Sequence, residues 1–192
     1  SKRVTVGKNK IPGVIGIKAV HLRTPDERKV VIKQKEMYID IGAKDKEDAE
    51  KKVQLGDYIS FDSSFDEIGG GKMKSKAIDD RAGCAILIEC MKKEYVNDIY
   101  FCFTAQEETG VKGASIVAHR LRSDVAFVVE ATTASDVPFL QEHEYSTSLS
   151  KGPVLTVMDR GSISDKTLNK YIMDLAKENN IRLTFDSNIC AT

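Results

Sequence analysis

The chain has 192 residues, of which 41% are hydrophobic and 30% charged, and 29 Lys and Arg residues balance 29 Asp and Glu residues. This length allows one or two domains with buried cores. Binding to a polyanion normally requires an excess of Lys and Arg, so we expect no nucleic-acid partner. No apolar run reaches the roughly 18 residues of a membrane span, so we expect no membrane contact.

Residues 1–66 are expected to form a β-rich domain. Short runs of β-branched and aromatic residues, separated by Gly and Pro turns, predict strands at Val14–Val20, Val30–Lys33, Tyr38–Ile41 and Tyr58–Phe61. One short helix is expected within Ala43–Val53, where Asp45 is a candidate N-cap. Several short strands with one small helix indicate a compact barrel or a PDZ-like module.

Residues 67–192 alternate between helical and strand patterns after the composition shift at Gly69-Gly70-Gly71. Helices are predicted at Asp80–Lys93, Gly113–Leu121 and Ser164–Asn179, the last with Ser164 as a candidate cap. Strands are predicted at Asp98–Ala105, Val125–Val129, Pro153–Val157 and Arg182–Phe185. The first of these strands is almost continuously apolar, as in a sheet that is covered on both faces. The predicted fold class is therefore α/β, with helices layered on a central sheet.

Acidic side chains follow two of the predicted strands and begin one predicted helix. Glu107, Glu108 and Glu130 come after strands, and Asp79 precedes the helix with Asp80 beside it. Ligands of open α/β sheets bind beyond the carboxyl ends of the strands. Converging carboxylates repel one another, and a divalent cation with oxygen ligands, such as zinc, cobalt or manganese, removes that penalty. The pattern favours a metal-dependent hydrolase, although an acidic pair at a helix start also commonly caps the helix.

The four cysteines, at positions 84, 90, 102 and 190, form no CxxC pair, and three lie among apolar residues. This usage is typical of buried thiols in a reducing compartment, and it lacks the spacing of a structural zinc site. We therefore expect a cytoplasmic protein. None of the three histidines is assigned a ligand role.

Three segments, in this order, carry a family resemblance: Ala77-Ile78-Asp79-Asp80-Arg81-Ala82-Gly83, Thr104-Ala105-Gln106-Glu107-Glu108-Thr109-Gly110-Val111-Lys112-Gly113-Ala114 and Val129-Glu130-Ala131-Thr132-Thr133-Ala134-Ser135-Asp136-Val137-Pro138. They resemble the TET-type (tetrahedral) aminopeptidases, which include glutamyl and deblocking aminopeptidases and some members that carry a cellulase label. Residues 13–16, 21–22 and 39–43 are similar to the inserted dimerisation domain of that family.

The resemblance implies a dinuclear metallo-aminopeptidase that hydrolyses N-terminal residues from peptides with a water that bridges two divalent ions, zinc or cobalt. Residues 1–66 would be the inserted dimerisation domain, and residues 67–192 part of the α/β catalytic domain. It also implies dimers that assemble into a larger homo-oligomer, a dodecamer.

The resemblance also assigns roles to single residues. Asp79 matches the bridging metal ligand, Glu108 a terminal ligand, and Glu107 the general base. Glu130 stands at a ligand position where many relatives carry Asp, and Asp80 stands where Asn is common and receives no ligand role. The family's His-x-Asp motif, Gly-Gly-Thr-Asp-Ala-like segment and final ligand histidine are absent from the 192 residues. We therefore expect an absent or incomplete metal site and no activity from these residues taken alone.

Two other functions compete with this interpretation. A glycoside hydrolase needs two carboxylates across one sugar bond and normally aromatic platforms, but the chain has no Trp and more than two candidate carboxylates. A non-catalytic assembly or binding module would use the β-rich domain and the charged Ala43–Val53 segment as contact surfaces.

Overall fold

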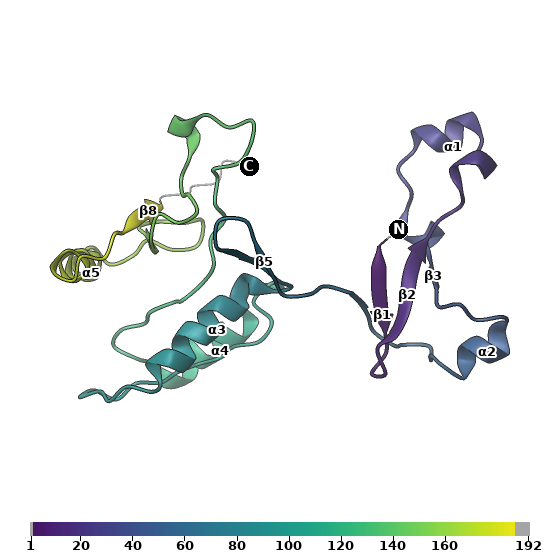
Figure 1. The fold of residues 1–192 in the computed structure, drawn as a ribbon. Coiled ribbons are helices and arrows are strands. Elements are labelled where there is room, and N and C mark those ends of the chain that lie inside the picture. Colours follow the sequence, from purple (N-terminus) through teal and green to yellow (C-terminus); the bar gives the residue numbers. More distant parts are fainter. Residues whose placement is uncertain (1, 187–192) are drawn as a thin grey trace. The chain divides into compact units, whose positions relative to one another are not determined.

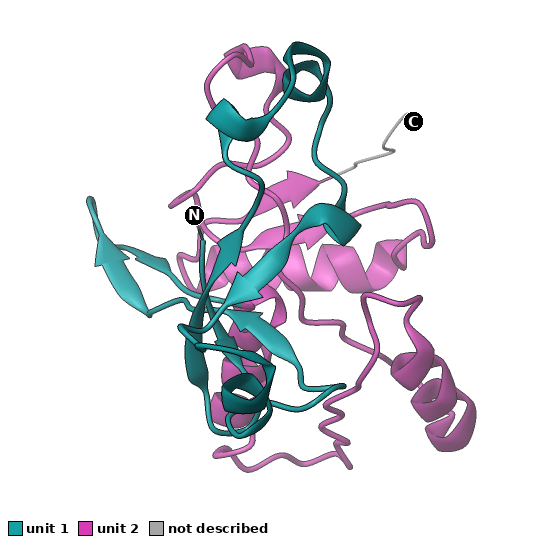
Figure 2. Ribbon diagram, turned by 90° about the vertical axis from the view of Figure 1, so that its right-hand side faces the viewer, with its two compact units in different colours: residues 1–76 teal, residues 77–192 magenta. Residues whose placement is uncertain are grey.

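The computed structural model describes residues 2–186. Cys190 and the end of the predicted catalytic segment therefore lie outside the described residues. Contacts divide the chain into two compact units, residues 1–76 and residues 77–192 (Figure 2). No helix among the described residues is long and apolar enough to cross a membrane.

Residues 1–76, hereafter unit 1, contain a four-stranded antiparallel sheet with the order β3-β2-β1-β4 (Figure 1). Its strands are β1 (Arg3–Val6), β2 (Ile11–Gly16), β3 (Tyr38–Asp40) and β4 (Ile59–Phe61). Val4 and Val6 are buried, whereas Arg3 is exposed and Thr5 is half-buried. This alternation follows from the two-residue period of a strand, and it gives the sheet one apolar face. A hairpin of β5 (Asp66–Ile68) and β6 (Lys72–Lys74) encloses the three glycines.

The short helix predicted within Ala43–Val53 is confirmed as α2 (Lys46–Glu50), and its N-cap is Asp45, whose carboxylate accepts a 2.8 Å hydrogen bond from Asp48 N–H. The strand predicted at Val30–Lys33 was wrong. These residues connect α1 (Pro25–Lys29) with a 3₁₀ turn at Gln34–Glu36. A capping box between Thr24 and Glu27 begins α1, so local capping outweighs the β propensity of the valines that follow.

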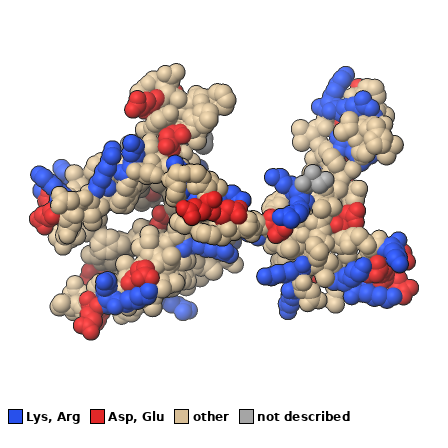
Figure 3. Space-filling model, in the orientation of Figure 1, with Lys and Arg blue, Asp and Glu red and all other residues tan. Residues whose placement is uncertain are grey.

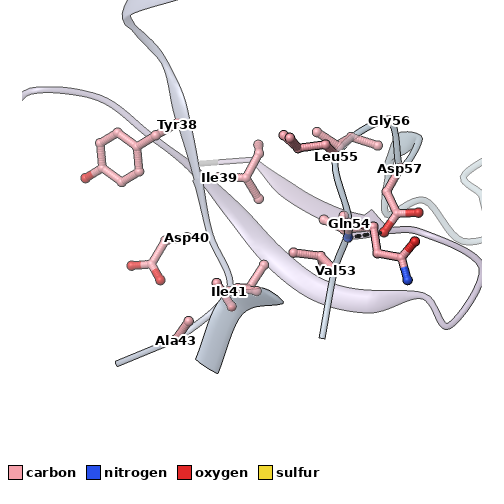
Figure 4. Close-up of a pocket in the computed structure, with 13 residues that line it drawn as sticks. Tyr38, Ile39, Asp40, Ile41, Ala43, Val53, Gln54, Leu55, Gly56 and Asp57 are labelled. Carbon is pink, nitrogen blue, oxygen red and sulfur yellow. Dashed lines mark hydrogen bonds between the residues drawn. The ribbon is translucent and has the colours of Figure 1, made fainter. Parts of the chain in front are cut away.

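A hollow of about 540 Å³ opens on unit 1 between β3, β4 and the segment that follows α2. Figure 4 shows Ile39, Ile41, Val53 and Leu55 around it, with Asp57 accepting a 2.8 Å hydrogen bond from Gln54 N–H. The lining is mainly apolar, and the Leu55 side chain is fully exposed at its edge.

Residues 77–192, hereafter unit 2, contain α3 (Ile78–Cys90), α4 (Lys112–Leu121), α5 (Lys166–Glu178) and a 3₁₀ turn at Glu142–Glu144. β7 (Val154–Thr156) and β8 (Thr184–Asp186) form a parallel pair. Helices and a parallel strand pair agree with the predicted α/β class. The cap of α5 is Asp165, which accepts a 2.7 Å hydrogen bond from Leu168 N–H, and not Ser164 as predicted. The Ser164 hydroxyl instead donates to the carbonyl of Thr156 at 2.7 Å.

Two predicted strands, at Asp98–Ala105 and Val125–Val129, are not formed as paired strands among residues 2–186. A strand exists through its backbone pairing, and within the described part of the chain no backbone hydrogen bond joins residues 99–104 or 125–129 to another segment. The apolar composition of these two segments predicts strands in the interior of a sheet, but a strand also needs a neighbouring strand with which its backbone can form hydrogen bonds.

Candidate metal centre

The start of α3 holds two acidic residues in a non-helical conformation. Ala77 has a left-handed backbone (φ +53°), Asp79 and Asp80 have non-helical angles, and the peptide bond between them is cis. Arg81 N–H then donates to the carbonyl of Ala77 at 3.2 Å, and the regular helix begins. Both carboxylates therefore lie at the N-terminal end of a helix, where the helix dipole favours negative charge.

The carboxylate of Asp80 is fixed by the helix that follows it. Its Oδ1 accepts a 2.9 Å hydrogen bond from Gly83 N–H, in the manner of an N-cap. Gly83 is buried, and a Cβ atom at this position would overlap the Asp80 carboxylate. The absence of a side chain at Gly83 thus allows Asp80 to lie against the first turn of α3.

Glu130 completes a cluster of three carboxylates, hereafter the acidic cluster, with Asp79 and Asp80. Each residue offers one carboxylate oxygen, and these three oxygens all lie within 4.8 Å of one another. Asp80 is half-buried, whereas Asp79 and Glu130 are exposed. Glu130 follows the extended segment 125–129, and its Oε1 accepts a 3.3 Å hydrogen bond from Ala131 N–H. Two segments that are distant in sequence therefore supply the cluster.

Partial burial raises the pKa of Glu130, and a hydrogen bond with Asp79 and the negative charges of Asp80 and Asp79 raise it further. Its hydrogen bond from Ala131 N–H acts in the opposite direction. The net direction shows that the negative charge of Glu130 is disfavoured where it stands. A proton or a cation at this position relieves the repulsion.

Glu107 and Glu108 lie in the turn that leads into α4. The carbonyl of Glu107 accepts hydrogen bonds from Gly110 N–H at 2.9 Å and from Val111 N–H at 2.8 Å. Both side chains are exposed, and among residues 2–186 neither joins the acidic cluster. Of the four residues predicted for the site, the structure brings Asp79 and Glu130 together and leaves Glu107 and Glu108 outside.

Asp80 is the member of the acidic cluster to which sequence reasoning gave no role. The sequence did contain a signal for a capping role of Asp80, since an Asp three residues before a helical residue can accept a hydrogen bond from the backbone N–H of that residue. Gly83 is the residue that donates this hydrogen bond. That signal predicts a cap, and it does not predict that the same carboxylate also lies beside Glu130.

The donor set of the acidic cluster suits one divalent cation. Oxygen ligands are preferred by hard and borderline ions, and each of the three residues offers one carboxylate oxygen. A second ion would need further ligands, and Glu108 is the predicted residue that could extend the set.

Comparisons with known proteins place the chain among peptidases. The family model of the M42 glutamyl aminopeptidases matches residues 1–191. A putative aminopeptidase of Acetivibrio thermocellus is 37% identical over 171 residues, which cover 88% of this chain and 50% of that protein.

Solved structures agree with the family match. The TET aminopeptidase of a marine sediment Thaumarchaeota archaeon has a TM-score of 0.84 and 37% identity, over 96% of this chain and 54% of that one. The TET1 peptidase of Pyrococcus horikoshii, which can assemble into a tetrahedron or a large octahedral shell, has a TM-score of 0.74 and 30% identity, over 97% of this chain and 56% of that one. The chain spans about half the length of the curated relatives it matches. It belongs to the M42 glutamyl aminopeptidase family.

Proposed function

We propose that the protein takes part in metal-dependent removal of N-terminal residues from peptides. The observation that carries this proposal is the acidic cluster, in which Asp79 and Glu130 lie together in a chain of an aminopeptidase family. A metal-dependent aminopeptidase holds a divalent cation at the scissile bond, and carboxylates that repel one another at the start of a helix are a suitable ligand set.

Asp79 and Glu130 are the proposed ligands of a zinc or cobalt ion, and Asp80 holds the start of α3 in place beside them. When bound, such a cation supplies Lewis-acid chemistry and lowers the pKa of a coordinated water. Glu107 is the proposed general base, which accepts a proton from the attacking water and delivers it to the leaving amine. Glu108 would hold a second ion as a terminal ligand, and Asp79 is the residue that would contribute to both.

We further propose that residues 1–66 form the inserted domain and supply contacts between subunits of a homo-oligomer. The Pyrococcus horikoshii relative can assemble into a tetrahedron or a large octahedral shell, and the apolar hollow of unit 1 beside the exposed Leu55 side chain is a suitable contact surface. The proposed location is the cytoplasm, where the free thiols of Cys84, Cys90 and Cys102 remain reduced.

The decisive experiment measures hydrolysis of a panel of aminoacyl anilides before and after chelation, with zinc, cobalt and manganese added back singly. Aminoacyl anilide hydrolysis that disappears with the chelator and returns with one metal supports the proposal. Turnover that survives chelation, or hydrolysis of cellulose oligomers alone, would refute it.

One observation favours a second function, that of a non-catalytic assembly module. Glu107 and Glu108 lie outside the acidic cluster in the described residues, so the proposed base is not next to the proposed ligands. Stable self-association and cation binding without turnover on any aminoacyl substrate would support this alternative. Deletion of residues 1–66 would then abolish self-association and leave cation binding at the acidic cluster in place.

A further inference from the structure

A buried threonine closes the loop that follows Glu130. Thr147 is 4% exposed, and its hydroxyl donates a 2.7 Å hydrogen bond to the carbonyl oxygen of Thr133. This bond joins the segment after Glu130 to the far end of the loop, which carries the 3₁₀ turn at Glu142–Glu144. Its loss would leave a hydroxyl or a carbonyl without a partner away from water, so the bond holds the two segments together.

Ser135 adds further hydrogen bonds to the same junction. Its backbone N–H donates to the carbonyl of Thr147 at 3.0 Å, and its hydroxyl donates to the same carbonyl at 3.1 Å. The Ser135 Oγ also accepts a 2.8 Å hydrogen bond from the backbone N–H of Ser146. These bonds join residues 133–135 to residues 146–147, hereafter the clamp, although neither segment is part of a regular strand.

The clamp lies close to Glu130 along the chain. Thr133 is three residues beyond Glu130, and three residues of fully extended chain span at most about 11 Å. The three carboxylate oxygens of the acidic cluster lie within 4.8 Å of one another, so a displacement of only a few ångströms would open the cluster. Holding the Thr133 carbonyl in place therefore restricts how far the Glu130 carboxylate can move from Asp79 and Asp80.

Such a restriction matters because the acidic cluster does not hold itself together. Its carboxylates carry charges of the same sign, and these repel one another when no cation lies between them. A ligand carboxylate that is already held in place loses less freedom when a cation binds, so the cation binds more tightly. The hydrogen bonds that keep Glu130 near α3 therefore contribute to cation affinity even though they lie outside the cluster.

We propose that Thr147 and Ser135 are positioning residues for Glu130. By holding the segment that follows Glu130, they keep its carboxylate beside Asp79 and so strengthen the binding of a divalent cation to the acidic cluster. This inference rests on the proposed function, in which Glu130 is a metal ligand. Neither Thr147 nor Ser135 binds the cation, and both act through Glu130.

Two substitutions of Thr147 separate the effect of its hydroxyl from that of its shape. Thr147→Val removes the hydroxyl and keeps the volume, whereas Thr147→Ser keeps the hydroxyl and removes a methyl group. Isothermal titration with zinc or cobalt should show about 10- to 100-fold weaker binding to Thr147→Val, the usual effect of replacing a residue that orients a metal ligand. Thr147→Ser should bind the cation as tightly as the unchanged protein. Ser164→Ala is the matched control and should also keep the affinity, since the Ser164 hydroxyl donates an equally short 2.7 Å bond to the carbonyl of Thr156.

The mobility of the backbone beside Glu130 gives a second readout, which needs no cation. Ala131 N–H donates to Glu130 Oε1 at 3.3 Å, and NMR relaxation measures the order parameter of this N–H bond. In Thr147→Val the order parameter should fall from about 0.85, the value of a rigid backbone, to below about 0.6, and in Thr147→Ser it should stay high. If Thr147→Val loses the ordered amides of α5, Ser135→Ala gives the same comparison, because it removes the acceptor of Ser146 N–H.

Three results would overturn the proposal. The first is an unchanged order parameter of Ala131 in a folded Thr147→Val variant. The second is unchanged cation affinity in that variant while Glu130→Gln binds the cation weakly, which would make Glu130 a ligand that the clamp does not position. The third is equal weakening of cation binding by Thr147→Ser and Thr147→Val, which would assign the effect to packing. Unchanged cation affinity in Glu130→Gln would instead refute the proposed ligand role itself, and the order parameter, measured without a cation, distinguishes that failure from a failure of the clamp.

Discussion

Replacement of Asp80 separates the two interactions of its carboxylate. The Asp80 side chain accepts a hydrogen bond from Gly83 N–H at 2.9 Å, and it adds negative charge beside Glu130. Asp80→Ala removes both interactions, whereas Asp80→Asn keeps an acceptor of equal capping quality and removes only the charge. The two variants should therefore differ in stability and agree in their effect on Glu130.

The expected magnitude follows from the cap. Loss of an N-cap costs about 0.5–2 kcal/mol, so Asp80→Ala should lower the free energy of unfolding by about 1 kcal/mol. Asp80→Asn should change it by less than about 0.5 kcal/mol, the usual range of a surface substitution. Urea titration followed by circular dichroism measures both values, because α3 contributes to the helical signal.

Cation affinity gives the second readout. If Asp80 positions the start of α3 and does not bind the cation itself, Asp80→Asn should weaken zinc or cobalt binding by about 10- to 100-fold. This is the usual effect of replacing a residue that orients metal ligands. Asp79→Asn, which removes a proposed ligand, should weaken it further. Isothermal titration with each metal measures the difference. Equal destabilisation by Asp80→Ala and Asp80→Asn would refute the capping argument, and equal loss of affinity in Asp79→Asn and Asp80→Asn would make Asp80 a ligand.

Three further predictions concern the base, the pH dependence and the assembly. Glu107→Gln should retain the bound cation while lowering aminoacyl anilide turnover by about 10²–10⁴-fold, and cation loss in this variant would show that Glu107 is a ligand. The folded-state pKa of Glu130 is raised above 4.5, so without divalent cations its ionisation destabilises the fold, and the free energy of unfolding should fall as the pH rises from 4.5 through the raised pKa. Glu130→Gln should flatten that dependence in urea titrations at stepped pH, and an unchanged slope would contradict the assignment. Deletion of residues 1–66 should lower the oligomeric state in sedimentation while the helical circular dichroism of the remaining residues persists, whereas unchanged assembly would remove the proposed role of this domain.

Sequence patterns correctly predicted those caps and helices that depend on interactions between neighbouring residues. The N-cap at Asp45 and the helix at residues 112–121 depend mainly on their own residues and nearest neighbours, and both are present. The errors occur where a second interaction competes. Ser164 and Asp165 are both acceptable caps, and the structure uses Asp165 because the Ser164 hydroxyl is engaged by the carbonyl of Thr156.

Charged side chains of both signs are interspersed over the face shown in Figure 3, so charge patterning alone does not single out the acidic cluster. The sequence indicated two members of the acidic cluster by their places along the chain, since Asp79 lies at the start of a predicted helix and Glu130 follows an apolar segment. It did not indicate that Asp80 lies with them, since that placement depends on the non-helical backbone before Arg81 and on the space left by Gly83.

The positions of Glu107 and Glu108 depend on a different kind of information. Glu107 and Glu108 were expected to lie near the acidic cluster because two predicted strands, Asp98–Ala105 and Val125–Val129, would end at the same edge of one sheet. This expectation holds only if both segments pair as strands. Within residues 2–186 the preceding segments 99–103 and 125–129 have no backbone partners, so the premise is not met and the turn at residues 106–111 is positioned only by its own hydrogen bonds and by α4. An apolar sequence indicates that a segment can pair as a strand. The position of its end is fixed only by the neighbouring strand with which it forms hydrogen bonds. The roles assigned to Glu107 and Glu108 therefore stay predictions.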